Sequence, residues 1–210
     1  SSPANMANLG NTLLFAATTT ANGTELWRSD GTEAGTVMVS DIRAGTTSSL
    51  PASLTSVNNS IVYFSAGEAT NGTELWKTDG TAGGTAMVTN LNPGSANSSP
   101  ANLTAFNGKL VFSATTSAAG TEIFISDGTA VGTTLLADIV AGTGSSSPTS
   151  FVAAGSRLYF LATTTANGQE LWKTDGTTVG TVLVKDINGT SASSTITNLT
   201  AVGSTLFFSA

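Results

Sequence analysis

The residues best suited to chemistry are carboxylates that recur along the chain at fixed spacing. Four glutamates each begin a Glu-apolar-aromatic tripeptide, in steps of 49, 48 and 48 residues: Glu25, Glu74, Glu122 and Glu170. A pair of carboxylates can serve a glycosidase as acid and base. An active site occurs once in a chain, however, whereas these glutamates occur in all four repeats. We therefore expect no catalytic residue, and expect the glutamates to accept hydrogen bonds from backbone or hydroxyl groups of the adjacent unit, because a buried unpaired charge is costly.

A second set of carboxylates begins an Asp-Gly-Thr tripeptide, three positions after each aromatic residue. The aspartate can accept hydrogen bonds from the backbone N–H groups that follow it, and the glycine can adopt a positive φ. The pattern therefore predicts a structural turn in each unit, formed by Asp30 and Gly31, Asp79 and Gly80, Asp127 and Gly128, and Asp175 and Gly176.

Calcium binding is the alternative role for the acidic residues. Asp41, Asp138 and Asp186 recur after the fourth expected strand of their units, with Asn90 at the matching place in the second unit. If they converged with the turn aspartates, they could supply oxygen ligands. The sequence lacks the dense Asp-x-Asp spacing of a calcium loop, so we predict no metal site and at most a secondary stabilising role for calcium.

The composition excludes several classes of function. The 210 residues include no cysteine and no histidine, which excludes a thiolate nucleophile, the usual zinc sites and a Ser-His-Asp triad. Thirteen acidic residues against seven basic ones give a formal net charge of −6, which argues against a nucleic-acid surface. No apolar stretch approaches the length of a membrane-spanning helix. A hydrophobic content of 40% is too high for a disordered chain.

The carboxylates belong to a repeat that fills the chain. In the second unit, β-branched and aromatic runs at 54–57, 61–65, 73–78 and 85–88 alternate with Asn- and Gly-rich turns. Four antiparallel strands in about 48 residues match the size of a β-propeller blade. We therefore predict an all-β protein of propeller-type blades, with another all-β stack, such as a β-solenoid, as the alternative. The units span residues 1–47, 48–97, 98–145 and 146–192, followed by a half repeat at 193–210.

The complete motif resembles a known repeat. Glu-Leu-Trp, two residues, Asp-Gly-Thr, two residues and Gly-Thr is similar to the ELWxxDGT repeat of large bacterial exported proteins; the third unit departs from it at Ile123-Phe124-Ile125. The resemblance implies propeller-like repeats and an extracellular or cell-surface location, and it implies no enzymatic activity. The Asp-Gly-Thr turn is also similar to the Asp-box hairpin of sialidases and other propellers.

The large aromatic residue of each motif has two interpretations: Trp27, Trp76, Phe124 and Trp172 either pack between repeats or stack on sugar rings. Phe124 keeps the apolar area but loses the indole N–H, which favours packing. Binding of cell-surface glycans is the alternative function. We interpret the basic residues that follow, Arg28, Lys77 and Lys173, as solvated charges of little energetic weight.

The half repeat suggests self-association. It restates the first part of the unit, so its apolar residues Leu206, Phe207 and Phe208 would form an exposed edge. Because the chain opens without Met and ends within an expected strand, we expect it to derive from a longer precursor. We expect copies of the protein to be its partners, joined head to tail by pairing of the surplus strands into a filament outside the cell.

Overall fold

The computed structural model describes residues 2–210, which form β-strands and no helix. The strands make four four-stranded antiparallel sheets and one two-stranded sheet. The first sheet contains β1 (Ala4–Leu9), β2 (Thr12–Thr19), β3 (Gly23–Ser29) and β4 (Val37–Ser40), and the second β5 (Ala52–Val57), β6 (Ile61–Glu68), β7 (Gly72–Thr78) and β8 (Ala86–Thr89). The third contains β9 (Ala101–Phe106), β10 (Lys109–Thr116), β11 (Gly120–Ser126) and β12 (Thr134–Ala137). The fourth contains β13 (Thr149–Ala154), β14 (Arg157–Thr164), β15 (Gly168–Thr174) and β16 (Val182–Lys185), and the fifth β17 (Thr197–Val202) and β18 (Thr205–Ser209).

Each sheet is a meander in which neighbouring strands are consecutive in the sequence. The second and third strands form the longest regular pairing, with seven residue pairs from Leu13↔Ser29 to Thr19↔Gly23 in the first sheet. Gly or Asn residues with positive φ occupy many of the short turns between strands, which is the chemistry expected of tight antiparallel connections.

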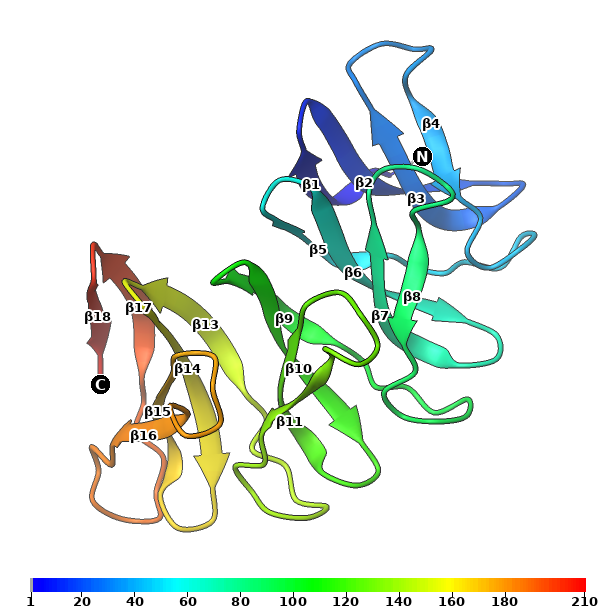
Figure 1. The fold of residues 1–210 in the computed structure, drawn as a ribbon. Coiled ribbons are helices and arrows are strands. Elements are labelled where there is room, and N and C mark those ends of the chain that lie inside the picture. Colours follow the sequence, from blue (N-terminus) through cyan, green and yellow to red (C-terminus); the bar gives the residue numbers. More distant parts are fainter. Residues whose placement is uncertain (1) are drawn as a thin grey trace.

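The sheets follow one another along a curved row, with the first and fifth sheets at its opposite ends (Figure 1). The first strands of successive sheets lie against one another, β1 on β5, β5 on β9, β9 on β13 and β13 on β17. They lie along the concave side of the row, whereas the fourth strands lie on the convex side (Figure 1).

The hydrophobic core is divided among the junctions between sheets. The first junction buries Leu14, Leu26 and Val39 of the first sheet with Val62, Phe64 and Ala66 of the second. Equivalent clusters lie between the second and third sheets and between the third and fourth. Because an internal sheet has a neighbour on each face, its central strands are apolar on both faces. This explains continuous runs such as Ile61 to Phe64 in place of strict alternation.

The all-β prediction is confirmed: within residues 2–210 every regular element is a strand. The expected strands of the second repeat correspond to β5 to β8, extended or shifted by a few residues. No helix of the length and apolarity needed to cross a membrane occurs among the described residues.

Candidate functional site

The recurrent glutamates lie fully buried at the junction between successive sheets. Glu74 accepts hydrogen bonds from the backbone N–H of Leu91 at 3.0 Å and from both the N–H and the hydroxyl of Ser98, at 2.9 and 2.5 Å. Glu25 accepts the equivalent three hydrogen bonds, from Ile42 and Ser49. The other two glutamates repeat it: Glu122 with Ile139, Val140 and Ser146, and Glu170 with Ile187 and Ser194.

The serine partner of each glutamate links one sheet to the next. Ser49 donates its N–H to the Thr24 carbonyl of β3, at 3.2 Å, and accepts the N–H of Gly67 in β6, at 2.8 Å. The carboxylate of Glu25 therefore fixes the loop that carries the chain into the second sheet. The serines, Ser49, Ser98, Ser146 and Ser194, escaped the sequence reasoning, although each follows its glutamate by 24 residues. The sequence does not distinguish these four serines, because the same loops contain many other serines and threonines.

Burial raises the pKa of Glu25, Glu74 and Glu122 above the ordinary value of 4.5, while the hydrogen bonds from serine and backbone act in the opposite direction. A carboxylate that is out of contact with solvent and surrounded by donors of its own chain cannot reach a substrate. The geometry therefore gives these glutamates a role in joining the sheets.

Three of the turn aspartates, Asp30, Asp79 and Asp127, are exposed, and the fourth, Asp175, is partly buried. All four hold the loop between the third and fourth strands. Asp30 accepts the N–H and the hydroxyl of Thr32, at 2.9 and 2.7 Å. Gly35 donates its N–H to the Thr32 hydroxyl, and the Thr36 hydroxyl donates to the Thr32 carbonyl. The other three turns repeat these bonds, around Asp79, Asp127 and Asp175.

The two glycines of each turn are required for different reasons. The first, at Gly31 and its equivalents, has φ near +90°, a region that side chains disfavour. The second, at Gly84 for example, lies so close to the Asp79 carboxylate that an added Cβ would come within 2.0–2.3 Å of it. The hydrogen bonds from threonine lower the pKa of Asp30, Asp79, Asp127 and Asp175 below the ordinary value of 3.8.

The acidic residues considered for calcium lie elsewhere, in the loops after the fourth strands. Asp41 and Asp186 each accept a hydrogen bond from a side-chain amide, of Asn22 at 3.0 Å and of Asn167 at 2.9 Å. Asp138 accepts the N–H of Gly142. Among residues 2–210, no three acidic side chains gather closely enough to hold a metal ion.

The motif aromatics of repeats two to four pack at the junction with the preceding sheet. Trp76 lies against the first junction cluster, Phe124 is part of the second, and Trp172 lies against the third. The indole nitrogens of Trp27, Trp76 and Trp172 are buried without a hydrogen-bond partner. Phe124 therefore replaces tryptophan without the loss of a hydrogen bond.

Two of the three basic residues after the aromatics, Arg28 and Lys77, are not simply solvated, which corrects the interpretation drawn from the sequence for these two. Arg28 donates to the carbonyl of Gly80 at 3.0 Å, and Lys77 donates to the carbonyl of Gly128 at 2.8 Å. Both acceptors are in the Asp-Gly turn of the following sheet. The sequence pattern could not reveal these bonds, because their partners are about 50 residues apart.

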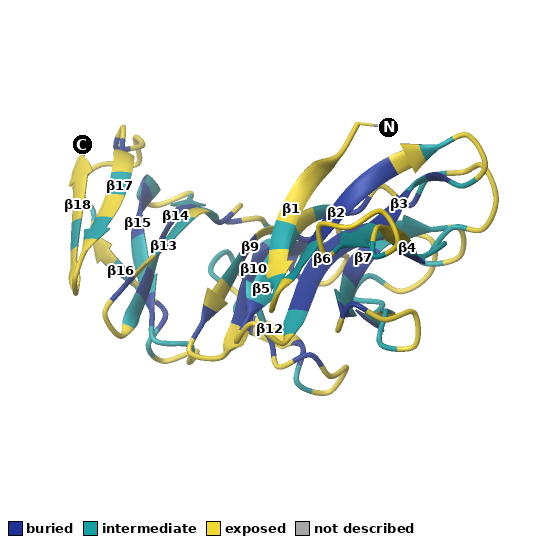
Figure 2. Ribbon diagram, turned by 90° about the horizontal axis from the view of Figure 1, so that it is seen from above, coloured by how far each residue is buried: buried dark blue, intermediate teal, exposed yellow. Residues whose placement is uncertain are grey.

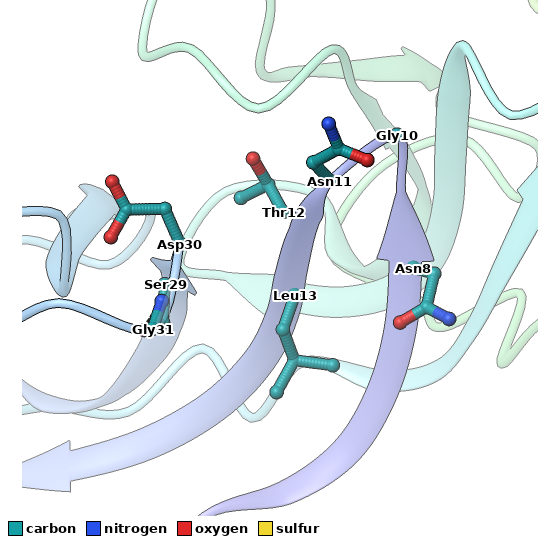
Figure 3. A pocket seen from close by; sticks show the side chains of 8 residues that line it. All are labelled: Asn8, Gly10, Asn11, Thr12, Leu13, Ser29, Asp30 and Gly31. Carbon is teal, nitrogen blue, oxygen red and sulfur yellow. Dashed lines mark hydrogen bonds between the residues drawn. The ribbon is translucent and has the colours of Figure 1, made fainter.

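The two end sheets each have one face without a neighbouring sheet. On the first sheet, an added Cβ at Gly31 would meet nothing within 4 Å, whereas one at Gly80 would meet Leu9 of the preceding sheet. A hollow of about 330 Å³ lies beside Gly31. Figure 3 shows this hollow between the turn, with Asp30, and the β1–β2 hairpin, with Leu13.

At the other end, β18 carries the residues expected to form an edge. Phe207 and Phe208 are 57% and 39% exposed, whereas Leu206 packs beside a small cluster formed by the fourth and fifth sheets. Figure 2 shows both ends of the row, β1 and the β17–β18 hairpin, as the most exposed parts of the sheets.

No family model matches the chain, and no curated protein matches it, so membership of the ELWxxDGT family stays a prediction. Solved structures are similar in fold. Acylaminoacyl peptidase from Pyrococcus horikoshii is 14% identical with a TM-score of 0.55, over 88% of this chain and 27% of that one. A prolyl endopeptidase is 13% identical with a TM-score of 0.53, over 83% of this chain and 24% of that one.

A third structure, GH43B from a xyloglucan locus of Bacteroides ovatus, is 14% identical with a TM-score of 0.43, over 86% of this chain and 40% of that one. This chain thus spans about a quarter of the length of the first two proteins. At such identities the likeness concerns the fold alone, which in this chain is a succession of antiparallel β-sheets.

Proposed function

We propose that this chain is a non-enzymatic structural protein of the cell exterior, built of β-propeller-type blades, that associates head to tail with copies of itself. The blade assignment is supported by the four-stranded meanders and by the mutual contact of their first strands along the concave side of the row. A structural role is supported by the recurrent glutamates, whose oxygens are buried and engaged in joining the sheets. The resemblance to exported repeat proteins supports the location.

The observation that carries self-association is the pair of open faces at the ends of the row. The C-terminal face exposes Val184 on β16 and Phe207 on β18, and the N-terminal face exposes Met6 on β1 and the hollow beside Gly31. At every internal junction, the faces equivalent to these two are packed together. A contact between two different faces of the same molecule is heterologous, and it propagates into a filament unless it closes into a ring.

Light scattering and negative-stain electron microscopy of Phe207→Lys test this proposal. We expect the unmodified protein to form chains whose mean mass grows with concentration, and Phe207→Lys to remain a monomer with an unchanged melting temperature. Val131→Lys is the matched control, because Val131 is 91% exposed on an internal turn; it should assemble normally. An unmodified protein that stays monomeric at high concentration contradicts the proposal.

Carbohydrate binding is a second candidate, favoured by one observation. Trp27 lacks a preceding sheet and lines a hollow of about 170 Å³ with Phe15, Thr18 and Thr36, and an aromatic ring beside hydroxyls suits a sugar ring. A glycan array with Trp27→Phe and Trp27→Ala tests this candidate. Reproducible sugar binding that Trp27→Ala abolishes would support it, whereas an array without signal would eliminate it.

A further inference from the structure

We propose that the junction between the third and fourth sheets is a hinge, at which the row of sheets changes its curvature by rotation about the first strands, β9 and β13. This junction is internal, with a complete four-stranded sheet on each side, and the hinge does not depend on self-association. Each junction has an inner side, formed by the first strands, and an outer side, formed by the third and fourth strands and the turn between them. The three junctions between four-stranded sheets differ in how their outer sides are held.

A basic side chain holds the outer side of the first and second junctions. Arg28 on β3 donates to the Gly80 carbonyl at 3.0 Å, and Lys77 on β7 donates to the Gly128 carbonyl at 2.8 Å. Each bond joins the third strand of one sheet to the Asp-Gly turn of the next. A hydrogen bond from a charged donor requires a short distance and a favourable direction, so a rotation that opens the outer side must break it.

The third junction has an apolar residue in place of this donor. Ile125 on β11 occupies the position of Arg28 and Lys77, and it packs against the apolar cluster that includes Phe106. It lies over the turn of the fourth sheet, because a Cβ added at Gly176 would be 3.8 Å from the Ile125 side chain. Apolar contact is non-directional. The two sheets can therefore slide by a small amount while the cluster stays buried and no polar pair breaks.

The basic residue closest to this turn does not replace the missing bond. Arg157 forms an ion pair with Asp175 at 3.1 Å. Both residues belong to the fourth sheet, since Arg157 begins β14 and Asp175 follows β15. The ion pair therefore moves with that sheet and leaves the outer side of the third junction without a polar connection.

A second polar bond is also absent from the third junction. At the second junction, Ser117, which follows β10, donates its N–H to the side chain of Asn92 in the loop after β8, at 3.1 Å. Val140 holds the place of Asn92 in the loop after β12, and its side chain has no acceptor. The first junction has its own additional bond, from the N–H of Gly10 to the side chain of Asn59 at 2.8 Å. Neither kind of bond crosses the third junction within residues 2–210.

The inner side of the third junction, in contrast, is held as firmly as the others. Asn102 on β9 donates to the Pro148 carbonyl, just before β13, at 3.2 Å. The N–H of Thr163 on β14 donates to the carbonyl of Ser146 at 2.8 Å, and Glu122 of the third sheet binds the same serine. β9 lies against β13 on the concave side of the row (Figure 1). A fixed inner side and an outer side without polar bonds are the two parts of a hinge.

Distances between spin labels, measured by electron–electron double resonance, test the hinge. The chain contains no cysteine, so introduced thiols are the only labelling sites. Ala82→Cys, Ala130→Cys and Thr178→Cys place labels at equivalent exposed turn positions of the second, third and fourth sheets. The pair 82/130 spans the second junction, and the pair 130/178 spans the third. We expect a broader distance distribution for 130/178, because the turns themselves have matching hydrogen bonds.

Reciprocal substitutions exchange the character of the two junctions. Ile125→Lys places an ammonium near the turn of the fourth sheet, so it should lower the population of displaced conformers across the third junction about tenfold and narrow the 130/178 distribution. Lys77→Ile should broaden the 82/130 distribution. Lys109→Ile removes the same charge from an exposed position of the third sheet. It is the control and should leave both distributions unchanged.

Two results would overturn the hinge. One is equal widths for 82/130 and 130/178 in the otherwise unmodified protein. The other is a 130/178 distribution that Ile125→Lys does not narrow, although its melting curve shows a folded protein. If Ile125→Lys does not fold, Lys77→Ile decides, because an unchanged 82/130 distribution after loss of the Lys77 bond would show that this bond does not restrain the junction.

Discussion

Glu74 and Ser98 are 24 residues apart, yet the carboxylate of the first accepts both the N–H and the hydroxyl of the second, at 2.9 and 2.5 Å. Glu74 belongs to the third strand of the second sheet, and Ser98 lies in the loop that leads to the third sheet. Ser98 in turn accepts the N–H of Thr115 on β10, at 2.8 Å. One carboxylate thus couples the internal structure of a repeat to the placement of the next.

Glu74→Gln should lower the free energy of unfolding by about 2–3 kcal/mol, because an amide NH₂ would face buried donors and leave at least one of them unpaired. Urea denaturation measures the loss. Glu33→Gln, at an exposed turn position, is the control and should change stability by less than about 0.5 kcal/mol. Equal stability of the two variants would show that the carboxylate does not support the junction.

The pH dependence of stability should have two opposing limbs. The pKa of the turn aspartates lies below 3.8 in the folded state, so their contribution is complete above pH 3.8 and is lost as pH falls through the folded pKa. The pKa of Glu25, Glu74 and Glu122 lies above 4.5, so their contribution is complete below pH 4.5 and is lost as pH rises through the folded pKa. Both contributions are complete together only between these two values.

We therefore expect maximum stability between pH 3.8 and 4.5, followed by a decline toward neutral pH that the net charge of −6 reinforces. Thermal unfolding from about pH 2 to about pH 8 measures the profile. Glu74→Gln should flatten the decline above pH 4.5, and Asp79→Asn should flatten the loss at lower pH. Stability that rises steadily up to pH 7 would contradict the assignment.

Gly84→Ala and Gly83→Ala form a matched pair in one turn. The new methyl group at position 84 would collide with the Asp79 carboxylate, whereas the one at position 83 would meet nothing within 4 Å. Gly84→Ala should destabilise the protein by about 1–3 kcal/mol, and Gly83→Ala should be neutral or slightly stabilising. Calorimetry of both variants measures the difference, and similar losses at the two positions would refute the close packing.

Trp76→Phe should cost less than about 1.5 kcal/mol, because the indole N–H has no partner to lose and most of the apolar area remains. Trp76→Ala should cost about 3–5 kcal/mol, because it leaves a cavity in the junction. Denaturant unfolding of the two variants measures these costs. A large loss in Trp76→Phe would point to a role for the indole nitrogen that packing does not supply.

Much of the fold could be predicted from the sequence, because the local signals agree with one another. The alternation of β-branched runs with turn residues gave the four strands of a unit, and the constant spacing of Glu25 and its equivalents gave the repeat. The turn role of Asp30 followed from short-range chemistry, since its partner, Thr32, is two residues away.

What the sequence did not reveal depends on contacts between repeats. The partner of Glu74 is one serine among many, Ser98, which lies 24 residues further along the chain in the loop to the next sheet. The carbonyl that Arg28 binds belongs to a turn 52 residues away. Because every residue has a backbone carbonyl, the residue type does not reveal which one accepts the bond. Composition and periodicity describe one repeat well, but the contacts between repeats require the three-dimensional packing.

Head-to-tail association is tested most directly by sedimentation velocity over about a hundredfold range of concentration. Because the contact joins two different faces, nothing limits growth at a dimer. We expect the distribution to move continuously from the 20.9 kDa monomer toward larger species as concentration rises, and Phe207→Lys to remain at the monomer position. A single monomer boundary at every concentration, or a distribution that stops at a dimer, would contradict the account.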